Sequence, residues 1–140
     1  MRWTALLFAA LAVPAILAGC AAPKSRLAAA TDGADFNRLS DARLRCTAET
    51  VAGLERTIAD PYETALAATD ICAGHEQAMI RFFASRGFQP AEYQPLIQCL
   101  RTFDLYDIGI GLTALRGNRG GYAPAPDRRF PAKEPSCFAG

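Results

Sequence analysis

The chain has 140 residues, with 15 basic and 14 acidic side chains, so its formal net charge is only +1. That length is typical of a single domain. The nearly balanced charge argues against nucleic acid as a main partner and against a strong general attraction to anionic membranes.

Residues 1–19 have the three parts of a signal peptide. Arg2 supplies the positive start, an uncharged apolar run covers residues 5–17, and small residues precede the expected cleavage point. The run is shorter than the roughly 20 residues that a membrane-spanning helix needs. Pro14 would also kink a permanent helix. We therefore predict that this segment directs export and is then removed.

The sequence Leu17-Ala18-Gly19-Cys20 resembles the lipobox of bacterial lipoproteins. In that class the chain is cut before the cysteine, which becomes the lipidated first residue. The resemblance implies a membrane anchor made of acyl chains such as palmitate on Cys20, and several chains together anchor a protein stably. Ala21 in place of an aspartate implies the outer membrane, on its periplasmic side. An uncleaved anchor, or a secreted protein with a chance cysteine, is the alternative.

The chain after the signal peptide divides into three parts by composition. Residues 20–34 contain the lipidated cysteine and a flexible tether, in which residues 27–30 can form a transient helical turn. Residues 35–116 form the folded domain, and residues 117–140 form an irregular basic tail. We predict an all-α fold, a small three-helix domain stapled by two disulfides and followed by this Pro/Gly-rich C-terminal tail.

The first predicted helix runs from about Asp35 to about Ala59. Its apolar face repeats every three or four residues, as an amphipathic helix requires, and consists of Leu44, Thr47, Val51, Leu54 and Ile58. The charged side chains of this segment, Arg43 among them, are expected on the solvated face.

The second predicted helix begins at Asp60-Pro61-Tyr62-Glu63. Asp60 suits the N-cap, Pro61 suits the first helical position, and Glu63 suits a capping box. The pattern continues to about Arg86, where Gly87 provides a stop.

The third predicted helix opens at Pro95 after a connection over residues 88–94, and it is the most apolar of the three. Its clear polar strip consists of Gln98, Arg101, Asp104 and Asp107. Gly109 and Gly111 each weaken a helix by roughly 1 kcal/mol relative to alanine, and they permit a close crossing, a kink or an early end.

Residues 117–140 are rich in glycine and proline, which disfavour helix and strand. This tail is basic and carries aromatic side chains, so its candidate partner contacts are Tyr122, Arg128, Arg129 and Phe130. The alternative is an ordinary solvated end. Cys137 is expected to pin the tail to the domain.

Four cysteines remain besides Cys20, and none belongs to a CxxC motif. An even number in an exported protein indicates disulfides. An antiparallel hairpin about residues 58–60 places Cys46 opposite Cys72, whereas a hairpin about residues 87–89 places residue 104, and not Cys99, opposite Cys72. We therefore predict the pairs Cys46–Cys72 and Cys99–Cys137. Four free thiols are the alternative.

The sequence contains no recognisable catalytic or metal-binding motif. The single histidine, His75, lacks the second histidine of a zinc-protease helix and is expected to be a partly buried structural residue. Asp104 and Asp107 are expected to be solvated. We predict no cofactor besides the lipid, and a non-enzymatic accessory subunit of an envelope assembly with a protein partner. The alternative is a ligand-binding or enzyme-inhibitor module with a groove between the second and third helices.

Overall fold

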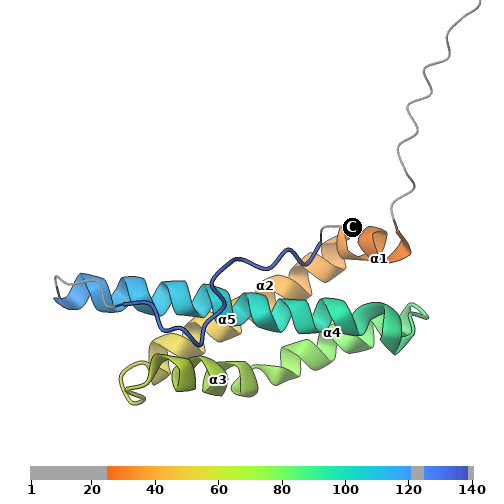
Figure 1. Cartoon of the computed structure of the whole chain (residues 1–140). Coiled ribbons are helices and arrows are strands. Elements are labelled where there is room, and N and C mark those ends of the chain that lie inside the picture. The colour runs from red at the N-terminus through yellow and green to blue at the C-terminus, as the bar shows by residue number, and fades with distance from the viewer. Residues whose placement is uncertain (1–24, 121–124, 139–140) are drawn as a thin grey trace, which may run out of the picture.

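A computed structural model describes residues 25–120 and 125–138 of the protein (Figure 1). The described residues form five helices and no strand: α1 (Arg26–Thr31), α2 (Ala34–Leu54), α3 (Pro61–Ile71), α4 (Ala73–Ser85) and α5 (Pro90–Gly120). The prediction of an all-α fold is confirmed. None of these helices is both long and apolar enough to cross a membrane.

Three long segments make up the domain, and each packs against the other two. They are α2, the consecutive pair α3 and α4, and α5 (Figure 1). The short helix α1 packs on α2 at one end of the molecule. The prediction of three helices therefore describes the main segments but not the number of helices.

The second predicted helix is interrupted at Cys72, and this divides it into α3 and α4. Cys72 ends α3 by donating its N–H to the Ala68 carbonyl oxygen. The apolar pattern passes across the break because α4 begins at the next residue. The start and stop were predicted correctly: Asp60 accepts a hydrogen bond from the Glu63 N–H, and Gly87 follows α4 with a φ of 74°, where glycine is favoured.

Helix α1 lies in the segment that we expected to be a flexible tether. The Ser25 hydroxyl oxygen accepts a hydrogen bond from the Ala28 N–H, and Leu27 packs against the core. The Arg26 guanidinium lies 4.2 Å from the ring centre of Phe88. A six-residue helix is not stable by itself, so these tertiary contacts stabilise it.

Helix α5 is longer at both ends than the third predicted helix. It begins at Pro90, just after Gln89, whose N–H donates to the Glu92 carboxylate, and it continues through Pro95. At its other end, Arg119 forms an ion pair with Glu55 beside the C-terminus of α2. A basic residue in the last turn also complements the helix dipole.

The core consists of two apolar clusters. The first joins α2, α4 and α5 and is aromatic, with Phe36, Phe83 and Tyr93 at its centre. The second joins α2, α3 and α5 around small side chains; its buried members are Val51, Ala65, Ala68, Ile108 and Leu112. Along α2 and along α5, one buried charged residue stands between the two clusters.

Both disulfides join the cysteines that the hairpin geometry predicted. Cys46 is bonded to Cys72, with Cα atoms 6.0 Å apart, and Cys99 is bonded to Cys137, with Cα atoms 5.5 Å apart. The first bond joins α2 to the break between α3 and α4. The second joins α5 to the tail, so that the last described residues of the tail lie near α1 (Figure 1).

Candidate functional site

The tail is held against α5 by an aromatic side chain that enters a glycine notch. A Cβ atom at Gly109 would lie only 2.7 Å from Cγ of Phe130, so the ring packs directly on the helix backbone. The ring also meets Tyr62 of α3 edge-on, with ring centres 5.3 Å apart. Phe130 is thus an internal anchor of the tail.

A second anchor is the ion-pair cluster of Arg129. Its guanidinium binds the carboxylates of Asp60 and Asp127, each at 2.6 Å. The Glu63 N–H and the Arg129 guanidinium lower the pKa of Asp60, while Arg129 alone lowers that of Asp127. The residue that caps α3 therefore also binds the tail.

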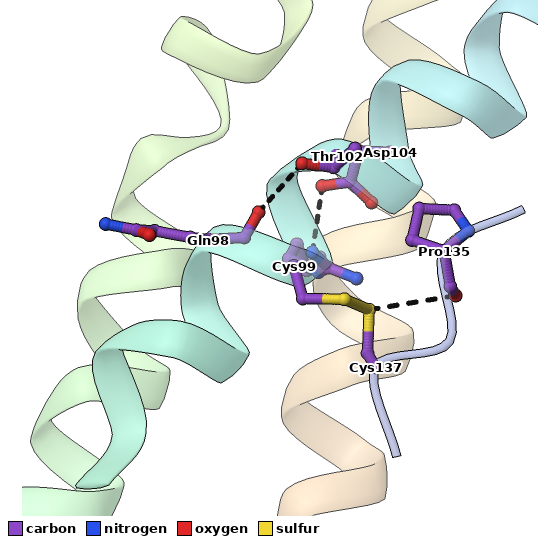
Figure 2. The surroundings of a disulfide bond; sticks show 7 residues. Gln98, Cys99, Thr102, Asp104, Pro135 and Cys137 are labelled. Atoms are coloured by element: carbon purple, nitrogen blue, oxygen red, sulfur yellow. Dashed lines mark hydrogen bonds and ion pairs between the residues drawn. A yellow bond between two sulfur atoms is a disulfide. The ribbon is translucent and has the colours of Figure 1, made fainter. Parts of the chain in front are cut away.

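The Cys99–Cys137 disulfide supplies the third anchor. Figure 2 shows it between α5 and the tail, next to Pro135. The sulfur of Cys137 lies 3.9 Å from the Pro135 carbonyl oxygen. A disulfide sulfur carries no proton to donate, so this is a packing contact.

Between the C-terminal half of α5 and the tail lies an open groove of about 990 Å³, which we call the α5–tail groove. Its lining is mainly apolar and includes Ile110 and Ala114 from the helix and Phe130 and Pro131 from the tail. Arg128 also lines it. The volume is near the upper end of the range of roughly 300–1,000 Å³ that is typical of small-molecule sites.

The structure separates the four candidate contact residues of the tail. Arg128 is exposed on the α5–tail groove, whereas Arg129 and Phe130 hold the tail in place. Tyr122 lies outside the described residues, as does Cys20. The groove itself was expected between the second and third helices but lies between α5 and the tail.

A buried ion pair lies between the two core clusters and was missed by the sequence analysis. Arg43 of α2 donates a 2.9 Å hydrogen bond to Asp104 of α5, and both side chains are only 6% exposed. We expected both residues to be solvated, and this was wrong. A signal was present in the sequence, since Asp104 is four residues from both Leu100 and Ile108 on the buried row of α5.

The ion pair is incompletely satisfied. Arg43 Nε and Asp104 Oδ1 are buried and make no hydrogen bond within the described part of the chain. Burial raises the pKa of Asp104 to about 6 despite the opposing charge of Arg43, and burial likewise lowers the pKa of Arg43. Loss of water therefore outweighs the attraction between the two charges.

His75 lies in the first turn of α4 and is partly buried, as expected. Residues 25–120 and 125–138 contain no group of three or more His, Cys, Asp or Glu side chains that could hold a metal ion.

Comparisons of this chain with protein-family models, curated proteins and solved structures find no match.

The notch at Gly109 can be tested with a pair of glycine substitutions. Gly109→Ala is expected to lower the free energy of unfolding by about 1–3 kcal/mol, because the new methyl group overlaps Phe130 and overpacks the site. Gly111→Ala meets nothing within 4 Å and should raise the free energy of unfolding by up to about 1 kcal/mol through helix propensity. Urea unfolding measures both. Equal stabilisation by the two changes would show that Phe130 does not occupy the notch.

Proposed function

We propose that this protein is a lipid-anchored binding protein of the cell envelope, without catalytic activity, and that it binds its ligand in the α5–tail groove. The observation that carries this proposal is an open apolar groove whose two walls are fixed to each other by Phe130, Arg129 and the Cys99–Cys137 disulfide. Preformed concave sites of this kind bind ligands with little loss of conformational freedom.

The position of the groove suits a protein anchored at Cys20. Helix α1, which follows the anchor segment, packs near Gly87 and Phe88, just before α5 begins. The groove lies near the other end of α5, about 30 Å further along the helix at 1.5 Å per residue. An anchor on the outer membrane would then leave the groove accessible from the periplasm.

Two kinds of occupant suit a binding protein, namely a segment of an envelope protein or a small apolar ligand. The first corresponds to an accessory subunit and the second to a ligand-binding module. Protein interfaces of standard size bury about 800 Å² on each partner over a broad surface. The concave shape and the volume of about 990 Å³ favour the small ligand.

Site-specific photocrosslinking in intact cells tests the proposal. A photoreactive amino acid at position 110 lies in the groove, whereas the same group at position 71, on α3, is exposed but outside it. We expect a crosslinked product from position 110 that position 71 does not give. Mass spectrometry of that product distinguishes a protein from a small molecule. Identical products from both positions, or none from position 110, would contradict the proposal.

A further inference from the structure

Much of the lining of the α5–tail groove is apolar. Ile110 is 52% exposed there. Ala114 lies one turn further along α5, and Phe130 and Pro131 face it from the tail. Covering such a surface stabilises a complex by about 25 cal/mol per Å² of apolar area.

The groove has an arginine, Arg128, that pairs with no carboxylate in the described part of the chain. Asp127 also lines the groove, but its carboxylate is bound by Arg129, which it shares with Asp60, and it forms no ion pair with Arg128. At the same end of the molecule, Arg119 is paired with Glu55, and Arg116 donates to the Ala59 carbonyl oxygen.

From these two observations we infer that the ligand of the groove is a single-chain amphiphile with an anionic head group. Its chain lies along α5 over Ile110 and Ala114, against Phe130, and its carboxylate or phosphate binds the guanidinium of Arg128. Arginine suits this role because its planar fork of N–H donors matches both head groups. The lining residues 106–118 span about 18 Å of helix at 1.5 Å per residue, a length that accepts an extended acyl chain.

This inference rests on the proposed function, and the experiment below separates the two. The full chain carrying Cys20→Ser is used, so that no acyl chain of its own competes for the groove. Palmitate, monopalmitin and hexadecyltrimethylammonium share a long chain and differ in the charge of the head group. Each probe displaces a fluorescent fatty acid below its micellar concentration, and its dissociation constant is measured.

Palmitate is expected to bind at least tenfold more tightly than hexadecyltrimethylammonium. Arg128→Ala should raise the dissociation constant of palmitate about tenfold, because one charge-assisted contact is lost, and should leave the dissociation constant of monopalmitin unchanged. Lys133→Ala, at an exposed cation of the tail outside the groove lining, is the matched control and should change neither. Equal binding of all three probes, or no effect of Arg128→Ala, would contradict the inference that the ligand has an anionic head group. The groove would then be a site for apolar chains of any head group.

The position of the chain is tested by Ile110→Glu against Ile71→Glu. Both side chains are more than half exposed, so both variants should fold, which circular dichroism checks. Ile110→Glu is expected to abolish binding of all three amphiphiles, and Ile71→Glu to leave it unchanged. Amphiphile binding that survives Ile110→Glu, or no binding by the unmodified groove, would overturn the inference. A groove-specific protein crosslink from position 110 would then show that the groove binds a protein segment and that only the ligand class is wrong.

Discussion

Asp104→Leu is expected to lower the free energy of unfolding by about 3–5 kcal/mol, because it leaves Arg43 charged and unpaired inside the protein. Arg43 cannot escape this cost by losing its proton, since the pKa of a guanidinium stays far above neutral. Thr47, one turn further along α2, uses its hydroxyl to bond the Arg43 carbonyl oxygen and offers the guanidinium no substitute. Urea unfolding at pH 7 measures the loss.

The double variant Arg43→Met with Asp104→Leu is the control for this prediction. Desolvation already outweighs attraction in the native pair, so apolar side chains of similar size should restore the stability of the unmodified protein or exceed it by about 1–4 kcal/mol. A double variant that is clearly less stable than the unmodified protein would show that the ion pair stabilises the fold more than apolar side chains would.

The same pair predicts the direction of a pH effect. The pKa of Asp104 rises from its ordinary value near 3.8 to about 6 on folding, so between these values the folded state binds a proton that the unfolded state does not. The contribution of this group to stability therefore increases as the pH falls from about 6 towards 4. Asp104→Asn, which keeps an acceptor for Arg43 but does not titrate, should lack this increase.

Removal of the Cys46–Cys72 disulfide is expected to have the second large effect. Cys46→Ala together with Cys72→Ala should lower the free energy of unfolding by about 3 kcal/mol, because the bond closes a segment of 26 residues and restricts the unfolded chain. The cost should appear as a lower midpoint of cooperative unfolding for the whole domain, since the bond joins α2 to the break between α3 and α4. Thermal unfolding followed by circular dichroism measures it.

The matched variant Cys99→Ala with Cys137→Ala removes the other disulfide and should act locally on the tail. The tail keeps Phe130 and Arg129 as anchors, but its last residues lose their covalent attachment to α5. We expect faster tryptic cleavage at Arg128, Arg129 and Lys133 in this variant than in the Cys46–Cys72 variant. Equal cleavage in both would mean that the disulfide does not hold the tail against α5.

Local sequence patterns correctly predicted the helix ends that depend only on neighbouring residues. Asp60 starts α3 because its side chain caps the helix and Pro61 suits the first helical position, and Gly87 follows the end of α4 because it adopts a positive φ. The disulfide pairs could also be predicted from the sequence. In an antiparallel hairpin, Cys46 and Cys72 lie opposite each other because they are about equally far from the turn. The all-helical fold follows from the same patterns.

Charged residues were the main source of error, because their burial depends on what lies across the helix interface. Arg43 and Asp104 are 61 residues apart in the chain, and each is acceptable in the core only because the other is there. Helix α1 was missed for a similar reason, since its six residues are stable only through contacts with Phe88 and the core.

The amino-acid sequence alone determined the helical class, the cysteine pairing and the resemblance to a lipoprotein signal. Only the tertiary structure revealed the α5–tail groove, which we propose as the ligand site. The α5–tail groove exists because Gly109 accepts Phe130 and because Arg129 reaches Asp60, and both contacts join parts of the chain that are distant in sequence. Periodicity describes one helix at a time, whereas a groove is formed by two segments whose separation depends on packing.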